Sequence, residues 1–303
     1  MKRGFLDIES LERTEIESVL NRSKYFQPAA GQTFKRFDTL RGRTVVNLFF
    51  ESSTRTRTSF EIAAKRLGAD VLSITALGSS VGKGESLVDT LNTLGAMRPD
   101  AIVMRHAASG APHFLSRYLP VPIVNAGDGT HEHPTQALLD ARTILDRRGS
   151  LEGLRIAIIG DIAHSRVARS NIFLLSKFEV EVVLCGPASL LPREMGQLAP
   201  GVTLTTDMET AIRGVDVIMM LRVQLERQHE AAFPATEYFR FYGLRPEHIN
   251  LAKPGVVVMH PGPINRGQEI SSEVADSQSS AILNQVENGV AVRMAVLESV
   301  LAA

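Results

Sequence analysis

The feature that most constrains this chain is a regular alternation of short apolar runs with longer amphipathic stretches. The short runs are rich in β-branched residues and apolar on both faces, as the buried strands of parallel sheets are. They predict strands at 44–50, 71–75, 101–105, 121–125, 155–160, 180–186, 215–221 and 256–260. Helical patterns lie between them at 54–67, 85–97, 134–148, 165–178 and 280–301. Strand–helix alternation of this kind indicates an α/β protein built on parallel sheets.

The predicted strands fall into two sets, separated by the segment RRGSLEG at 147–153, where Gly and Ser interrupt the pattern. We therefore expect two domains, each a parallel β-sheet flanked by helices, at 1–147 and 148–283. The helix at 134–148 would join them. A chain of 303 residues is long enough for two domains of ordinary size.

Composition excludes several classes of partner. Lys plus Arg and Asp plus Glu both number 33, so the net charge is zero, and we expect neither nucleic-acid nor membrane binding. The apolar runs are far shorter than the roughly 20 residues that a membrane-spanning helix needs. The N-terminus lacks the apolar run of a signal peptide, and the single cysteine, Cys185, fits a reducing compartment. We expect a cytoplasmic protein in which local clusters bind any anion.

Ligands of open parallel sheets bind beyond the carboxyl ends of the strands. The segment FFESSTRTRTSFE at 49–61 places Ser53-Thr54-Arg55-Thr56 between a strand end and a helix start. A helix N-terminus offers free N–H groups and a positive dipole end, both suited to an anion. The alternative is simple N-capping with a solvated arginine, but a cap needs only one hydroxyl. This segment predicts a phosphate site.

Other cations follow the later strands. Arg105 comes directly after the strand AIVM, as a ligand-facing group or as a salt-bridge partner. Lys83 lies in the glycine-containing loop 79–85, where a plain exposed lysine is the simpler alternative. Arg166 stands at a predicted helix start, and Arg222 follows the strand VDVIMML. Together these residues indicate a site for substrates that carry several negative charges.

The turn after the strand RIAIIG resembles a dinucleotide-binding turn but lacks GxGxxG. Asp161 and His164 stand where glycines would let a pyrophosphate approach. Arg166 suggests a carboxylate ligand instead. A nicotinamide-dependent dehydrogenase is therefore a disfavoured alternative.

His133 and Gln136 open the helix at 134–148 and lie three residues apart, so both can face one side of its first turn. They can present two donors to a carbonyl oxygen and an amide, although a lone histidine there would more often be a cap. A metal site at 131–133 is not expected, because the spacing is poor and no thiol or further histidine lies nearby in sequence. The turn HPGP at 260–263 has fixed backbone carbonyls.

The segments STRTRTSFE and HPTQALLD resemble the two signature motifs of the aspartate and ornithine carbamoyltransferase family, and the resemblance covers essentially the whole chain. It implies an N-terminal carbamoyl-phosphate domain, a C-terminal amino-acid domain and a last helix, about 284–303, that returns to the first domain. It also implies a homotrimer with active sites shared between subunits and no cofactor. A larger assembly with regulatory chains or dihydroorotase is left open.

The amino-acid acceptor follows from charge. Ornithine members of the family typically carry an HCLP segment and an SMG loop, where this chain has HPGP (260–263) and LRVQ (221–224). Arg222 suits a carboxylate and would repel the side-chain ammonium of ornithine. The expected reaction is carbamoyl transfer from carbamoyl phosphate to L-aspartate, an early step of de novo pyrimidine biosynthesis. A different amino-acid acceptor and a non-catalytic anion-binding protein are the alternatives.

The resemblance also implies a role for each candidate residue. Those expected to act in catalysis are Arg55, Thr56, Arg105 and His133. Those expected to bind carbamoyl phosphate are Ser53, Thr54, Arg55, Thr56, Arg105, His133, Gln136, Gly262 and Pro263, the last two through their carbonyls. At Gly262 many relatives carry a larger residue. Those expected to bind L-aspartate are Arg166, Arg222, Gln224 and Lys83, with Lys83 and either Ser79 or Ser80 supplied by a neighbouring subunit.

Overall fold

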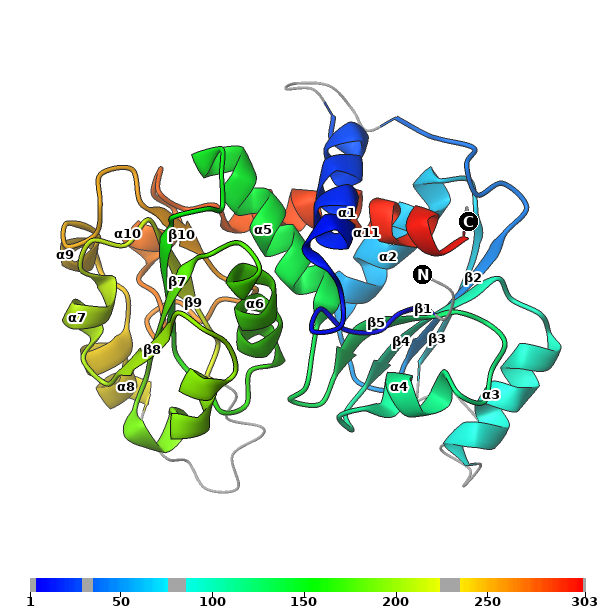
Figure 1. Cartoon of the computed structure of the whole chain (residues 1–303), viewed down its shortest axis with the longest axis horizontal. Helices are drawn as coiled ribbons and strands as arrows, with labels where there is room; N and C mark the ends of the chain where they lie inside the picture. The colour runs from blue at the N-terminus through cyan, green and yellow to red at the C-terminus, as the bar shows by residue number, and fades with distance from the viewer. Residues whose placement is uncertain (1–3, 29–34, 76–85, 224–234, 302–303) are drawn as a thin grey trace. The chain divides into compact units, whose positions relative to one another are not determined.

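The computed structural model describes residues 4–28, 35–75, 86–223 and 235–301, which form two compact units (Figure 1). Unit 1 comprises Met1–Leu139 and Glu287–Ala303, and unit 2 comprises Asp140–Val286. Helices α5 (Pro134–Arg148) and α11 (Ile282–Leu301) each contribute residues to both units. The division between the units therefore falls inside α5, earlier in the chain than the expected boundary at 147.

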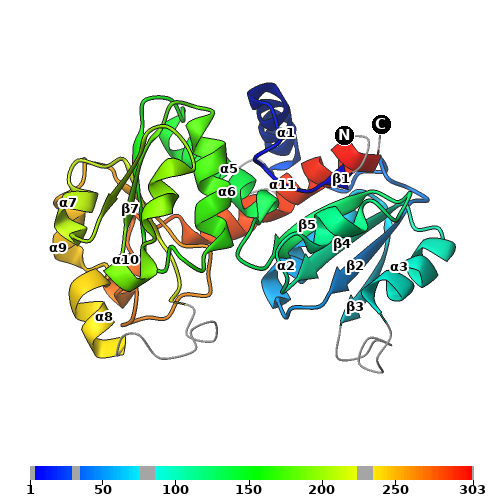
Figure 2. The same ribbon diagram turned by 60° about the horizontal axis from the view of Figure 1, so that its bottom comes forward.

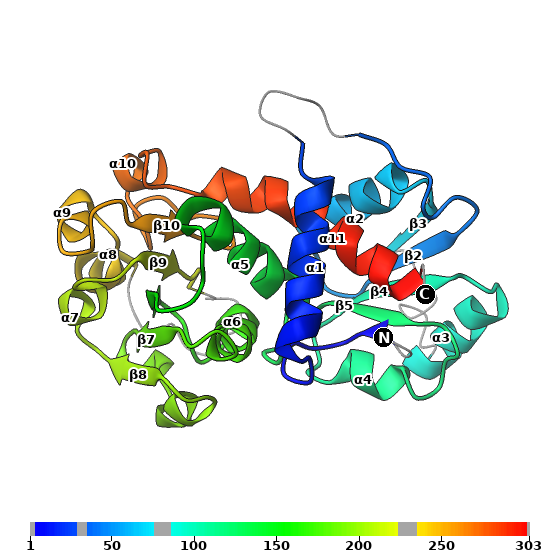
Figure 3. The ribbon, with the colours of Figure 1, turned by 45° about the horizontal axis from the view of Figure 1, so that its top comes forward.

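Unit 1 is built on a five-stranded parallel sheet of order β1-β5-β4-β2-β3. Its strands are β1 (Gly4–Phe5), β2 (Thr44–Phe49), β3 (Asp70–Thr75), β4 (Ala101–His106) and β5 (Ile123–Asp128). Its other helices are α1 (Arg13–Phe26), α2 (Thr54–Arg66), α3 (Leu87–Ala96) and α4 (Ala111–Leu115). Helices α3 and α4 cover one face, while α1, α2 and the unit 1 part of α11 cover the other (Figure 3).

Alternation along the strands explains this layering. Val46, Leu48, Ile102 and Met104 point to one face of the sheet, where they pack in a buried cluster with residues of α3 and α4 such as Leu91. The intervening residues of the same strands face the opposite way and are buried as well. A sheet buried on both faces has strands without polar alternation, which is the pattern of the sequence.

Unit 2 repeats the architecture of a sheet flanked by helices (Figure 2). Its strand order is β10-β9-β6-β7-β8, again all parallel. Its strands are β6 (Arg155–Ile159), β7 (Glu181–Cys185), β8 (Val202–Thr205), β9 (Val217–Met220) and β10 (Val257–Met259). Its other helices are α6 (Arg166–Ser176), α7 (Met208–Ile212), α8 (Ala235–Tyr242), α9 (Pro246–Ile249) and α10 (Ser272–Ala275), with short 3₁₀ turns at Ala188–Leu190 and Arg193–Gln197. The buried core joins this sheet to α7 and α8.

The predicted fold class, the eight predicted strands and the five predicted helices are confirmed. The sequence pattern did not predict β1, β8, α1, α4 or α7 to α10. Most of these elements are too short to show a period, and β8 is only partly buried, so it lacks the apolar signature of the central strands. Among the helices that the structure describes, none is long and apolar enough to cross a membrane.

Both sheets have a point at which the order of the strands along the chain reverses. In unit 1 it lies between β2 and β4, because β2 pairs with β3 on one side and with β4 on the other. In unit 2 it lies between β6 and β9, since β6 pairs with both β7 and β9. Ligands of open α/β sheets bind in the crevice at such a switch point. The fold therefore directs attention to the segments that follow these four strands.

Candidate active site

The start of α2 lies at the switch point of unit 1. Ser53 is the N-cap residue, with an extended backbone, but its hydroxyl accepts no capping hydrogen bond from the described α2 amides. Capping therefore does not explain this hydroxyl. The first turn of α2 contains no acidic residue, so no carboxylate of the helix competes with an anion for its N–H groups. Thr54 and Arg55 are exposed, and Thr56 is buried.

Arg105 lies on the neighbouring strand, where it pairs in register with Phe49 at the end of β2. Its guanidinium Nη2 donates to Glu51 Oε1 at 2.7 Å, and Nη1 donates to the Ala126 carbonyl at 3.3 Å. Its side chain is only 11% exposed, so the guanidinium is held at the sheet edge. Of the two roles expected for Arg105, the salt bridge is present in the structure.

Glu51 was missed by the sequence analysis. It stands in FFESSTRT between the strand end and the helix start, and only the hydroxyl-bearing residues and Arg55 of this segment were interpreted as a site. Its carboxylate holds the Arg105 guanidinium, which keeps the arginine beside the hydroxyl-rich turn. The signal that would have identified it is an acidic residue embedded in an otherwise cationic and hydroxyl-bearing segment.

His133 and Gln136 open α5 after the third strand of this edge, β5. Both are nearly buried, at 4% and 7% exposure. The carbonyl of His133 accepts from the amides of Gln136 at 2.9 Å and Ala137 at 3.3 Å, so the first turn is formed, and Pro134 occupies the first helical position. The two side chains thus stand on one rigid helical turn.

The turn that leads to His133 is held by Asp128, the fully buried last residue of β5. Its carboxylate accepts from the Gly110 amide at 2.6 Å, from Asn125 Nδ2 at 2.8 Å and from the Glu132 amide at 3.1 Å, and it contacts His131 Nδ1 at 3.0 Å. Burial by itself raises the pKa of Asp128, but these hydrogen bonds outweigh it and the pKa is lowered. The bond to Asp128 in turn raises the pKa of His131.

The N-terminal segment is tied to the same turn. The buried Glu132 carboxylate accepts from the amides of Ile8 and Glu9, and His113 Nε2 lies 2.6 Å from Asp7 Oδ2. Burial raises the pKa of Asp7, but hydrogen bonds from His113 and Ser10 prevail and bring it to about 2. Glu132 is therefore an anchor for the start of the chain.

His113, Asp128 and His131 form one group, among the described residues, whose ligand atoms all lie within 4.8 Å of one another. The group differs from the 131–133 run weighed in the sequence. The Asp128 oxygens already accept from three N–H donors and contact a histidine, so a metal ion would have to displace these bonds. A hydrogen-bonded network describes the group better than a metal site.

In unit 2 the turn after β6 begins with Gly160, which has φ +138°. A Cβ there would lie 2.9 Å from the Leu221 carbonyl oxygen, so the close approach of the segment after β9 requires glycine. The next residue, Asp161, is fully buried and pairs with His164 Nδ1 at 2.8 Å. The negative charge of a buried carboxylate at this turn would repel a pyrophosphate, which argues against the dehydrogenase alternative.

Two arginines follow the adjacent strands β6 and β9. Arg166 is the first residue of α6 and is 5% exposed, while the hydroxyl of Ser165 caps the helix by accepting from the Ala168 amide at 3.1 Å. Arg222 is partly buried and comes two residues after β9 ends. The two guanidinium-bearing segments thus share one edge of the sheet. Four other candidates, Ser79, Ser80, Lys83 and Gln224, lie outside the described residues.

The third strand of this edge, β10, ends before His260. His260 is buried, Gly262 is partly exposed and Pro263 is exposed. The Gly262 amide donates to His260 Nδ1 at 2.7 Å, which shapes the turn. Among the described residues, the predicted site residues of each unit therefore lie at or after the ends of three neighbouring strands.

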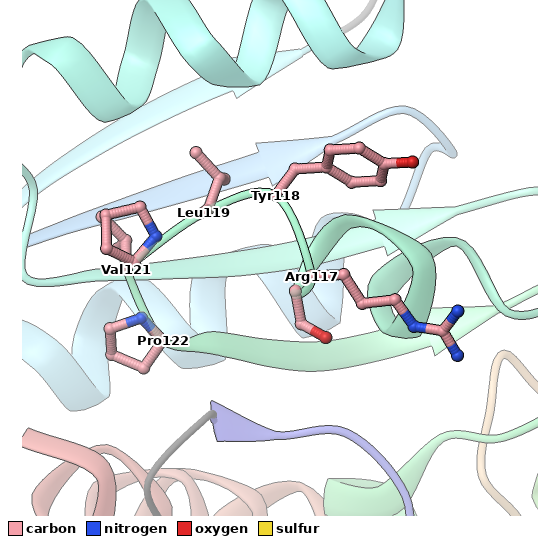
Figure 4. A pocket seen from close by; sticks show the side chains of 7 residues that line it. Arg117, Tyr118, Leu119, Val121 and Pro122 are labelled. Carbon is pink, nitrogen blue, oxygen red and sulfur yellow. The ribbon is translucent and has the colours of Figure 1, made fainter.

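A hollow in unit 1 lies elsewhere. It is lined by residues of the connection from α4 to β5, whose side chains are drawn in Figure 4: Ser116, Arg117, Tyr118, Leu119, Pro120, Val121 and Pro122. This segment enters β5 at its amino end, which is the opposite edge of the sheet from the candidate site. The hollow is not part of that site.

Comparison with known proteins agrees with this arrangement. Residues 3–146 match the model "Aspartate/ornithine carbamoyltransferase, carbamoyl-P binding domain", and residues 152–300 match "Aspartate/ornithine carbamoyltransferase, Asp/Orn binding domain". The chain is 77% identical over 301 residues to the aspartate carbamoyltransferase catalytic subunit of Solibacter usitatus, covering 99% of this chain and 100% of that protein. It is 56% identical over 296 residues to the corresponding subunit of Geobacter sulfurreducens, covering 97% and 95%.

Solved structures are similar as well. Aspartate transcarbamoylase from Trypanosoma cruzi in complex with carbamoyl phosphate and aspartate has a TM-score of 0.90 at 33% identity, with 99% of this chain and 97% of that chain covered. Ornithine carbamoyltransferase from Pyrococcus furiosus has a TM-score of 0.88 at 28% identity, with the same coverage. The two family models together span nearly the whole chain, and the chain belongs to the aspartate/ornithine carbamoyltransferase family.

Proposed function

We propose that this protein is an enzyme that transfers the carbamoyl group of carbamoyl phosphate to the amino group of L-aspartate. The products are N-carbamoyl-L-aspartate and phosphate, and the reaction is an early step of de novo pyrimidine biosynthesis. The observation that carries the proposal is that anion-binding groups lie at the switch point of each sheet, hydroxyls with Arg105 in unit 1 and Arg166 with Arg222 in unit 2.

Unit 1 is assigned to carbamoyl phosphate. The phosphate would be held at the start of α2, where backbone amides and side-chain donors converge, by Ser53, Thr54, Arg55 and Thr56. Thr56, Arg105 and His133 would polarise the carbamoyl oxygen. Gln136 and the carbonyls of Gly262 and Pro263 would take the carbamoyl NH2. The burial of Thr56, His133 and Gln136 supports these roles, because donors shielded from water act more strongly on developing charge.

Unit 2 is assigned to aspartate. Arg166, Arg222 and Gln224 would bind its carboxylates, with Lys83 and Ser79 or Ser80 from a neighbouring subunit. Relatives of this fold serve both acceptors, as the names of the Trypanosoma cruzi and Pyrococcus furiosus enzymes state. Arg222 decides between them, because a guanidinium attracts the side-chain carboxylate of aspartate and repels the ammonium of ornithine.

The proposed reaction follows from the placement of the two substrates. The aspartate amine attacks the carbamoyl carbon, and a tetrahedral intermediate carries negative charge on the former carbonyl oxygen. The bond to phosphate then breaks as the amine passes a proton to the departing phosphate. Arg105 and His133 stabilise the charge that develops on that oxygen. Positioning of two anionic substrates supplies much of the remaining rate. The reaction as written needs neither cofactor nor metal.

The assay that tests the proposal measures carbamoylated product colorimetrically with carbamoyl phosphate and, in turn, aspartate and ornithine. We expect product with aspartate and background with ornithine. Product with ornithine alone would assign the other acceptor. Absence of product with either, in a folded preparation that binds phosphate, would support a non-catalytic anion-binding protein.

We also propose a cytoplasmic homotrimer with active sites shared between subunits. Subunit mixing tests the shared site. Lys83→Ala and Arg55→Ala should each inactivate every site of a homotrimer. If Lys83 acts on a neighbouring subunit, reassembled mixtures regain part of the activity, because some sites then carry neither lesion. Well-reassembled mixed trimers without recovered activity would show that Lys83 serves its own chain or none.

A further inference from the structure

Behind the end of β10 lies a buried chain of hydrogen bonds that the assignments above do not use. His260 is 1% exposed and Glu269 is fully buried. His260 Nε2 lies 3.1 Å from Glu269 Oε1, and the same oxygen accepts from the Asn265 amide at 2.5 Å. His260 Nδ1 accepts from the Gly262 amide at 2.7 Å. One carboxylate thus holds both ends of the turn 260–265.

The geometry fixes the protonation of the ring. A backbone amide can only donate, so His260 Nδ1 must be the acceptor and carries no proton. The proton then resides on Nε2 and points to Glu269. Each ring nitrogen therefore has a different task, one toward the carboxylate and one toward the turn.

A second arm starts from the backbone of the same histidine. The His260 amide donates to Gln285 Oε1 at 2.9 Å, and Gln285 Nε2 donates to Asp140 Oδ1 at 2.7 Å. Asp140 Oδ2 accepts from Asn171 Nδ2 at 2.9 Å. Asp140 belongs to the segment HPTQALLD, and Asn171 lies in α6, the helix that Arg166 begins. The network connects three segments that carry candidate site residues.

The two prolines restrict φ within this turn, but the turn has few hydrogen-bond donors of its own to hold it in place. Gly262 has no side chain, and Pro261 and Pro263 have no N–H to donate. The orientation of its carbonyls therefore depends on the hydrogen bonds of the flanking residues His260 and Asn265. Burying a carboxylate, an imidazole, an amide and a second carboxylate costs free energy unless every group is bonded, and apolar packing would close the same space at lower cost. A buried polar network of this kind is explained if its role is to fix the orientation of the turn 260–265.

We propose that Glu269 and His260 are positioning residues that orient the Gly262 and Pro263 carbonyls toward the carbamoyl NH2 of the substrate. The inference rests on the proposed function, which assigns that contact to the turn. Glu269 acts on His260, and His260 acts on the Gly262 amide, so neither needs to touch the substrate. Misplacement by about 1 Å of a group that orients a reacting centre lowers turnover by as much as 10²-fold.

Four variants separate this role from a general loss of stability. Glu269→Gln keeps an acceptor oxygen for His260 Nε2 and the Asn265 amide, whereas Glu269→Met keeps the size and removes the acceptor. His260→Asn keeps an acceptor near the Nδ1 position and loses the bond to Glu269. His260→Gln keeps a donor near the Nε2 position and loses the bond to Gly262. Asp216→Asn is the matched control, because Asp216 is a buried carboxylate bonded to Lys253 and the Arg155 amide, and it directly precedes β9 at the amino edge of the same sheet.

Steady-state kinetics with both substrates and hydrogen exchange of residues 260–265 without substrate are the readouts. We expect Glu269→Met and His260→Gln to lower kcat at least about tenfold, to leave the aspartate KM within about threefold and to speed exchange in the turn. Glu269→Gln should retain most of the turnover, His260→Asn should retain more turnover than His260→Gln, and Asp216→Asn should lower Tm without either effect. Equal kcat in Glu269→Met and Asp216→Asn at equal loss of Tm would overturn the inference. So would greater activity in His260→Gln than in His260→Asn. If the wild-type enzyme is inactive but the variants still show the expected differences in hydrogen exchange of residues 260–265, the proposed function alone is refuted.

Discussion

The two units share a parallel sheet and a switch point, yet they present their cations in different ways. Unit 1 gathers hydroxyls and Arg55 in four consecutive residues at one helix start, beside an arginine held by Glu51. Unit 2 takes its two arginines from segments more than fifty residues apart in the chain, after different strands, and braces the neighbouring turn with a buried network.

The difference matches the shapes of the proposed ligands. A phosphate is compact, so the amides and side chains of one helical turn can surround it. An amino acid with two carboxylates is extended and needs guanidiniums at separate points. The same sheet edge thus serves a local site in one unit and a dispersed site in the other.

The largest effect is expected from Arg105→Ala, which removes a donor from the unit 1 edge. Loss of one donor to a charge developing in the transition state costs about 3 kcal/mol, or roughly a 10²-fold to 10³-fold loss in kcat. Circular dichroism should show the fold intact, because Arg105 lies near the carboxyl end of β4, where it bonds to Glu51 and the Ala126 carbonyl at the edge of the sheet. Turnover near that of the wild type would remove Arg105 from the proposed mechanism.

A smaller effect, on stability, is expected from Asp7→Asn, because the Asp7 carboxylate is hydrogen-bonded to His113 and Ser10 in unit 1. The pKa of Asp7 is lowered to about 2 in the folded chain by bonds from His113 and Ser10 against the opposing effect of burial. A lowered pKa stabilises the fold above the unfolded pKa of about 3.9, and this stabilisation is lost as pH falls toward about 2. We expect a loss of about 2 kcal/mol at pH 7 that shrinks steadily between pH 4 and pH 2. Chemical denaturation across this range measures it, and a loss independent of pH would show that Asp7 acts through packing alone.

The smallest effects compare two serines at helix starts. Ser165→Ala should lower the free energy of unfolding by about 1 kcal/mol, because its hydroxyl caps α6. Ser53→Ala should change it by less than about 0.5 kcal/mol, since its hydroxyl makes no capping bond to the described amides of α2, but it should weaken phosphate binding. Denaturation and phosphate titration of both variants provide the comparison. A stability loss in Ser53→Ala equal to that in Ser165→Ala would mean that Ser53 is an ordinary cap.

The contrast between local and dispersed features also explains which parts of the structure could be predicted from the sequence. The central strands, and the position of residues 53–56 at a helix start, could be predicted because buried runs and a contiguous motif are local in sequence. Glu51 could not be singled out, because its role depends on Arg105, which reaches it only across the pairing of β2 with β4. The bonds from Glu132 to Ile8 and from Gln285 to Asp140 join residues more than a hundred positions apart, and no period or motif encodes them.

The shortness of several helices limited the rest of the prediction. Helices such as α4 and α7 span five residues each, less than two helical turns, so the amphipathic period does not develop. Helix α1 is long enough to show one and was identified only in the structure, where Ile16, Val19 and Leu20 form its buried face. In the sequence, the charged residues Arg13, Glu15 and Glu17 surround Ile16, so the apolar face of this helix was not recognised.

The central claim is the division of the two substrates between the two units, and crossed titration tests it most directly. Binding of carbamoyl phosphate and the aspartate requirement would be measured separately in Arg55→Ala and Arg222→Ala. Each charge-assisted pair contributes about 1.5–3 kcal/mol, or roughly a 10-fold to 150-fold change in affinity. We expect Arg55→Ala to weaken carbamoyl phosphate binding by this factor, and Arg222→Ala to raise the aspartate requirement while leaving carbamoyl phosphate affinity nearly unchanged. An Arg222→Ala variant that loses affinity for carbamoyl phosphate and keeps its affinity for aspartate would contradict the account.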